Sequence, residues 1–113
     1  MSDRMLRVIL AVFLFIPGMA MAAIGKVVIF SPADSATVDS NYAFKLKYQA
    51  VPGPDGDHLH LNVDGKRVDI IRRLSGTTEV EPLSPGKHQV CLAINTKSHV
   101  PTGAERCISV ISK

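Results

Sequence analysis

Three of the four histidines have the type and spacing of metal ligands. His58 and His60 are two residues apart in an alternating segment, so both point to one face of an extended strand, with Cβ atoms about 6.6 Å apart. His99 lies in a later loop that we expect at the same end of the fold, so three imidazoles can meet and leave a fourth coordination position open for water or a partner group. Imidazole ligands without thiolate or thioether suit Cu(II) or Zn(II). Asp55 or Asp57 could then orient one ring through its second nitrogen.

The same histidine pair has a second interpretation. A His-Leu-His-Leu strand is also the pattern of an outward, solvated face over an apolar core, and His-x-His by itself is a weak motif. Under this interpretation the face binds no ion and serves at most to contact a partner protein. His88 begins another strand at the opposite end of the domain, too far away to join the other three histidines. We expect it to hydrogen-bond a structural corner.

The only two cysteines, Cys91 and Cys107, lie in two alternating segments separated by a loop that we place at 95–104. If Cys91 stands opposite Cys107 in an antiparallel pair, the apolar Val90 faces the apolar Ile108, and a shift of one residue would break this match. Opposed residues lie about 4.5–5.5 Å apart, within the range that a disulfide needs. The Cys-x-x-Cys spacing of redox-active pairs is absent. The sequence therefore predicts a structural disulfide on the outward face.

Short alternating segments divided by turn residues run along the chain, and none shows a helical apolar stripe. We expect strands near residues 26–30, 42–48, 58–63, 68–71, 77–83, 88–94 and 105–110, with 35–41 as a turn or short edge segment. Asp64-Gly65 is a strong signal for a two-residue hairpin turn, because both positions need positive φ. About seven such strands predict an all-β, immunoglobulin-like or fibronectin-III-like antiparallel β-sandwich, with a small barrel as the alternative.

The amino terminus has the order of a secretion signal. Residues 1–7 are basic, 8–15 are an uninterrupted apolar run, and 20–22 place small residues where a signal peptidase cleaves. The run is too short to span a membrane. We therefore predict a signal peptide at 1–22 and one soluble domain at 23–113, in the periplasm or secreted, with no membrane span after cleavage. Such a compartment is oxidising and permits the disulfide.

The composition of the remaining chain narrows the classes of function. Residues 1–22 hold two arginines and one aspartate, so without them the net charge falls from +3 to +2, too little to favour nucleic acid as a partner. All four methionines also lie in 1–22, which argues against a thioether Cu(I) site. No serine sits in a nucleophile elbow, and the carboxylates are scattered over turns and strands. We expect no enzymatic activity.

Three motifs carry a family resemblance. Residues 31–38 look like the S-P-A-D-G-A-T-V opening of exported bacterial immunoglobulin-like domains, and 83–90 resemble the L-x-P-G-x-[YH]-x-V corner before their penultimate strand. The segment 56–65, the corner histidine His88 and the later His99 together resemble small exported bacterial domains of unknown function. This resemblance spans about 56–110. It implies the sandwich fold and no particular activity.

Two functions remain as hypotheses. The first is a periplasmic, non-catalytic binding module that coordinates Cu(II) or Zn(II) through the histidines. The second is a structural or protein-interaction module of an envelope assembly, which binds a protein partner through a sheet face or edge and holds no metal.

Overall fold

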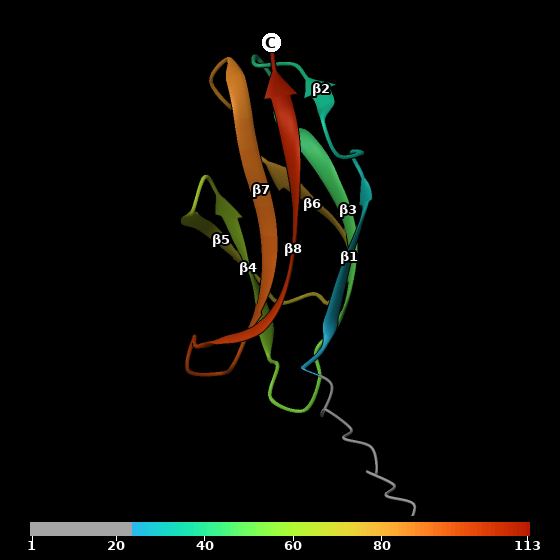
Figure 1. The fold of residues 1–113 in the computed structure, drawn as a ribbon, viewed down its shortest axis with the longest axis vertical. Coiled ribbons are helices and arrows are strands. Elements are labelled where there is room, and N and C mark those ends of the chain that lie inside the picture. Colours follow the sequence, from blue (N-terminus) through green and yellow to red (C-terminus); the bar gives the residue numbers. More distant parts are fainter. Residues whose placement is uncertain (1–23) are drawn as a thin grey trace, which may run out of the picture.

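The alternating segments form eight strands in the computed structural model, which describes residues 24–113 (Figure 1). They are β1 (Lys26–Ser31), β2 (Ala36–Val38), β3 (Phe44–Val51), β4 (His58–Val63), β5 (Lys66–Ile71), β6 (Ser75–Val80), β7 (Gly86–Asn95) and β8 (Pro101–Ser112). Within this described part, no helix is long and apolar enough to cross a membrane. The predicted all-β class is confirmed, while the predicted signal peptide at 1–22 lies outside the described residues.

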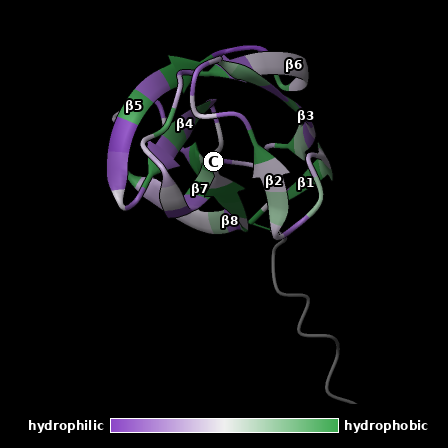
Figure 2. Ribbon diagram, turned by 90° about the horizontal axis from the view of Figure 1, so that it is seen from above, coloured by the Kyte–Doolittle hydropathy of each residue, from purple (hydrophilic) through white to green (hydrophobic). Residues whose placement is uncertain are grey.

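The strands form two sheets that face each other across the core (Figure 2). One sheet has the order β1-β3-β6 and the other the order β2-β8-β7-β4-β5. Neighbouring strands are antiparallel except that β2 runs parallel to β8. Since β2 arises from the segment expected as a turn or short edge, the structure adds a brief edge strand to the predicted sandwich. The partly buried Val38 anchors it against the core.

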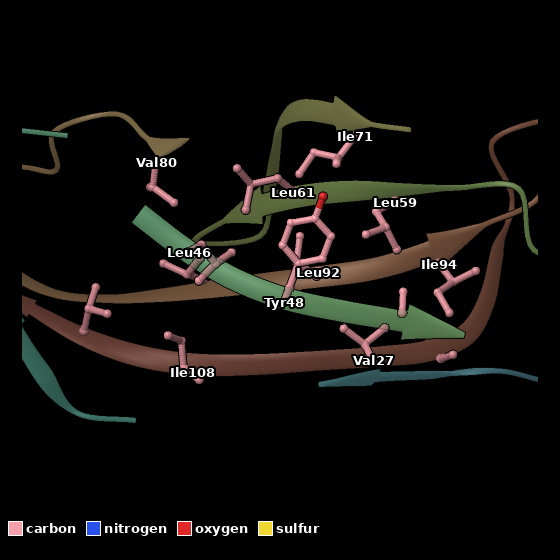
Figure 3. Packing of buried hydrophobic residues seen from close by; sticks show 14 residues of the cluster. Val27, Leu46, Tyr48, Leu59, Leu61, Ile71, Val80, Leu92, Ile94 and Ile108 are labelled. Atoms are coloured by element: carbon pink, nitrogen blue, oxygen red, sulfur yellow. The ribbon is translucent and has the colours of Figure 1, made fainter. Parts of the chain in front are cut away.

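The core is built from the inward-facing residues of both sheets. In Figure 3 the ring of Tyr48 from β3 lies among the leucines of β4 and β7. Tyr48 is almost fully buried, and its hydroxyl donates a hydrogen bond of 2.7 Å to the carbonyl oxygen of Arg73. This bond satisfies the one polar atom that the tyrosine brings into the core, and burial raises the pKa of its hydroxyl.

The turn between β4 and β5 has the predicted form. Asp64 has φ 51° and Gly65 has φ 83°, and Val63 pairs with Lys66 directly across the two-residue turn. This turn fixes the register of β4, and therefore decides which of its side chains face away from the core.

The β7–β8 hairpin carries the predicted disulfide. Cys91 stands opposite Cys107, and their sulfurs are bonded. The loop is shorter than the predicted 95–104, because β7 runs on to Asn95 and β8 begins at Pro101. A register irregularity near the start of β8, where Gly103 has φ 104°, permits this longer pairing. Strand β6 likewise begins and ends earlier than the predicted 77–83.

Candidate metal centre

Strand β4 places His58 and His60 side by side on the face of the sheet that points away from the core. The strand lies between β5 and β7. His58 is paired with Asn95 of β7, and His60 is paired with Ala93 of β7 and Ile70 of β5. The two histidines are only 1% and 8% exposed. The prediction of a solvated histidine face is therefore wrong at this end of the strand, because the flanking strands and the β7–β8 loop cover it.

His99 comes from that loop, which is closed by hydrogen bonds to Thr96. The backbone N–H of His99 donates to the carbonyl oxygen of Thr96 (2.9 Å), and the N–H of Thr96 donates to the carbonyl oxygen of Val100 (2.8 Å). The Thr96 hydroxyl oxygen also accepts from the N–H groups of Ser98 and Val100, each at 3.2 Å. The hydrogen bond between Thr96 and Val100 leaves the three residues 97–99 at the tip of the loop, and the last of them, His99, has φ 66°. Hairpin loops of this length usually place glycine at this left-handed position.

The three imidazoles meet in a small triangle of nitrogens. The Nε2 atoms of His58 and His60 are 3.1 Å apart, and the Nδ1 atom of His99 lies 3.2 Å from each of them. The structure therefore brings together all three predicted ligands, two from neighbouring positions of one strand and one from 39 residues further along the chain.

Hydrogen bonds alone cannot satisfy all three nitrogen–nitrogen contacts of this triangle. A ring nitrogen has one in-plane site, which carries either a proton or a lone pair. A hydrogen bond needs a proton on one nitrogen and a lone pair on the other, so at least one of the three contacts always sets two protons or two lone pairs against each other. An unsatisfied polar contact in a buried place is costly. A cation at the centre of the triangle would instead accept a lone pair from each ring.

The triangle also has the size of a tetrahedral site. If an ion lies about 2.05 Å from each nitrogen, the observed edges of 3.1–3.2 Å put it about 1 Å out of their plane, with N–metal–N angles of about 100°. These angles are close to tetrahedral. They leave one coordination position that the three histidines do not fill.

Asp57 orients the most buried of the three rings. Its Oδ2 atom is 2.9 Å from Nδ1 of His58, and the guanidinium of Arg72 lies 3.6 Å from the same oxygen. The hydrogen bond from His58 is the main cause that lowers the pKa of the Asp57 carboxyl. The ionised carboxylate keeps a proton on Nδ1 and leaves the Nε2 lone pair of a neutral His58 free for an ion. Of the two acidic residues suggested by the sequence, Asp57 makes this contact.

Burial favours the neutral form of His60, which is the form that binds metals. It is the largest cause that lowers the pKa of His60, followed by the charges of His58, Arg67 and His99. A lower pKa favours the neutral ring, which is the ligand form. The basic residues near the centre, among them Arg67 and Arg72, belong to no motif that the sequence pattern reveals. The Arg72-Arg73 pair that follows the return strand was the available signal.

His88 lies at the other end of β7 and holds a corner together. Its Nδ1 is 2.6 Å from Oδ2 of Asp64, and its Nε2 is 2.7 Å from the carbonyl oxygen of Ser84. The second oxygen of Asp64 accepts the backbone N–H of Gln89 at 2.9 Å. The Asp64-Gly65 turn is thereby tied to the start of β7. Because both ring nitrogens face acceptors, the protonated ring is favoured.

This corner predicts a pH-dependent contribution to stability. The hydrogen bond to Asp64 is the main cause that raises the pKa of His88 above its ordinary value of 6.5, and Asp64 has its pKa lowered from 3.8, chiefly by the backbone hydrogen bond from Gln89. Because the folded protein binds the His88 proton more tightly than the unfolded chain does, the protonated ring contributes its full stability below pH 6.5. This contribution is lost as the pH rises through the raised pKa of His88. The stability difference between the wild type and His88→Asn should therefore be largest below pH 6.5 and shrink as the pH rises through the raised pKa of His88.

Denaturant unfolding over that pH range measures this difference. The other three histidines are present in both proteins, so their contributions cancel when the two are compared. A stability difference that stays constant with pH would show that the charge of His88 does not strengthen the corner.

A hollow of about 640 Å³ lies elsewhere, between β5 and β6. Buried apolar residues line it, including Leu61 and Val80, and so do the exposed carboxylates of Asp69, Glu79 and Glu81. None of the histidines lines it. Both flanking strands are at the edge of their sheets.

Solved structures that are similar to this chain identify its fold. No family model and no curated protein matches the chain. Among solved structures it is similar to the fibronectin(III)-like modules of CbhA from Clostridium thermocellum, with a TM-score of 0.63, 17% identity, and 77% of this chain and 96% of that chain covered. This similarity shows the fold alone, and it confirms the predicted fibronectin-III-like sandwich.

Two further structures share parts of this architecture. A lytic polysaccharide monooxygenase of Jonesia denitrificans matches with a TM-score of 0.52 and 15% identity, covering 70% of this chain and 58% of that one. An engineered protein matches with a TM-score of 0.54 and 23% identity, over 81% of this chain and 21% of that one. In both cases this chain corresponds to less than two thirds of the other protein, and the likeness again concerns the fold.

Proposed function

We propose that this fibronectin-III-like domain is an exported, non-catalytic binding module that holds one divalent metal ion through His58, His60 and His99. The observation that carries the proposal is the nearly equilateral triangle of three imidazole nitrogens with edges of 3.1–3.2 Å. Two of its three rings are buried, and one is oriented by a carboxylate through its second nitrogen. Such an outer carboxylate is a common partner of metal-binding histidines.

Within this proposal, zinc fits better than copper(II). Cu(II) prefers a tetragonal arrangement, in which three nitrogens at about 2.0 Å would form two edges of about 2.8 Å and one of about 4 Å. The three nearly equal edges favour the tetrahedral arrangement of Zn(II) instead.

A binding role rather than catalysis is supported by the position of the histidines. The large hollow between β5 and β6 is not lined by them, so the centre does not face that candidate substrate cavity. Export to the periplasm or the exterior is supported by the Cys91–Cys107 disulfide, since such bonds persist in oxidising compartments.

Metal uptake by purified, tag-free protein tests the proposal. After dialysis against a chelator, the wild type should take up one equivalent of Zn(II), measured by calorimetric titration and elemental analysis. The variant His58→Ala/His60→Ala should take up none, because a single imidazole remains. His88→Ala is the matched control, since it removes a histidine from the far end of β7 and should keep full uptake. Unchanged uptake by the double variant would refute the site.

A second candidate function is docking of a protein partner of the cell envelope. It is favoured by the hollow between the edge strands β5 and β6, which the carboxylates of Asp69, Glu79 and Glu81 line. An extended segment with basic side chains would complement this surface. If the wild type takes up no ion in the titration above, docking becomes the better supported function.

A further inference from the structure

Within residues 24–113, the fourth coordination position of the centre has no protein ligand of the usual kinds. Among the described residues, the group of side chains able to hold an ion here consists of His58, His60 and His99 alone, without a fourth histidine, cysteine or carboxylate. The carboxylate of Asp57 is directed to the other nitrogen of His58. Whatever completes a tetrahedral ion must therefore be water, another oxygen donor or a molecule from outside.

Basic side chains from three segments lie near the centre, where Arg67 acts on His60 and both Arg72 and Lys97 act on Asp57. Arg67 of β5 is paired with Asn62, which follows His60 by two residues, so Arg67 projects from the same face of the sheet. Arg72 follows β5 and contacts Asp57 at 3.6 Å. Lys97 lies in the His99 loop, two residues before the ligand. All three side chains are exposed and are therefore accessible to a molecule in solution.

The same face of the sheet carries fewer acidic than basic side chains near the centre. Asp57 is the carboxylate next to the triangle. Glu105 projects from this face on β8, but it lies against the sulfurs of Cys91 and Cys107. A divalent ion bound by three neutral imidazoles keeps its full charge of two. Together with three basic side chains and one adjacent carboxylate, the centre would hold a clear excess of positive charge.

We infer that the bound ion accepts a small carboxylate or oxyanion from solution at its fourth position, and that Arg67 and Arg72 strengthen its binding. The inference depends on the proposed metal site. The ion supplies the coordinate bond, and the guanidinium groups supply charge and hydrogen-bond donors suited to oxyanions. The module would thus hold an anion only when it is loaded with metal.

Cobalt(II) makes the fourth position visible, because its d–d absorption responds to a change of ligand. Co(II)-loaded protein is titrated with acetate and, separately, with sulfate, while perchlorate keeps the ionic strength constant. We expect a saturable spectral change with at least one of these anions. A response to acetate alone would assign the site to carboxylates, and a response to sulfate would assign it to oxyanions.

Charge variants test the role of the arginines. Arg67→Gln/Arg72→Gln should weaken anion binding about tenfold, the order expected when two nearby positive charges are removed in a solvated site, while Co(II) stoichiometry stays at one. Lys45→Gln/Lys47→Gln is the matched control, because it removes the same charge from exposed positions on β3 of the other sheet.

The outcomes separate the two claims. A chain that takes up no Co(II) overturns the proposed function and this inference with it. Uptake of Co(II) without a spectral response to either anion overturns the inference alone. Equal weakening by both double variants would overturn the role of the arginines, because general charge would then explain the effect.

Discussion

Replacing His99 by glycine should change stability and metal affinity in opposite directions. The metal-free variant should be more stable than the wild type by about 1 kcal/mol, because His99 has a left-handed backbone with φ 66° that costs a residue with a Cβ about 1–2 kcal/mol and that glycine adopts without strain. Removing the third imidazole also relieves the unsatisfied contact among the three ring nitrogens, which adds to this gain in stability. Zn(II) affinity should fall by more than about a hundredfold, since even a change behind the ligands costs 10–100-fold.

Urea unfolding of the metal-free proteins and calorimetric titration with Zn(II) measure the two effects. Ser98→Gly is the control, because Ser98 lies in the same loop without a positive φ, and glycine there should lower stability slightly and leave Zn(II) affinity unchanged. If His99→Gly destabilises the metal-free protein, the loop is not strained. If the variant binds Zn(II) as tightly as the wild type, His99 is not a ligand.

Loss of the disulfide should produce the largest change in stability. Cys91 and Cys107 are 16 residues apart, and closing a loop of this size stabilises a protein by about 3 kcal/mol in the chain-entropy model. For a domain of this size, the loss corresponds to a fall in Tm of about 12–24 °C. We expect it both on reduction of the wild type and in Cys91→Ala/Cys107→Ala.

Calorimetric melting with and without reductant checks this prediction. The double variant serves as the internal control, since reductant should leave its Tm unchanged. A wild-type Tm that does not respond to complete reduction, verified by thiol titration, would show that the bond contributes nothing to the folded state.

Much of this architecture could be predicted because a strand has a period of two. Alternation around Cys91 and Cys107 admits one register that matches apolar with apolar residues, and that register is observed. The Asp64-Gly65 turn was recognisable because few other residue pairs accept two positive φ values. The meeting of His58 with His99 followed from the order of strands in a sandwich, which puts the start of β4 beside the end of β7.

The burial of the histidines could not be predicted in the same way. Alternation assigns His58 and His60 to the face away from the core, but it does not reveal what covers that face. The cover depends on the extension of β7 to Asn95 and of β8 back to Pro101, which shortens the loop and brings His99 over the strand. This extension requires an irregularity beside Gly103, and a glycine in a polar segment also reads as an ordinary loop residue.

Under the proposed metal function, the pairing of His58 with Asn95 would make metal uptake a reporter of correct strand pairing. The three nitrogens come from positions up to 41 residues apart, and a slip of β4 by one residue would turn its two imidazoles into the hydrocarbon interior. A misaligned or partly folded chain would still contain every histidine and yet offer no triangle. Metal stoichiometry would therefore count the molecules whose sheets have found their native alignment.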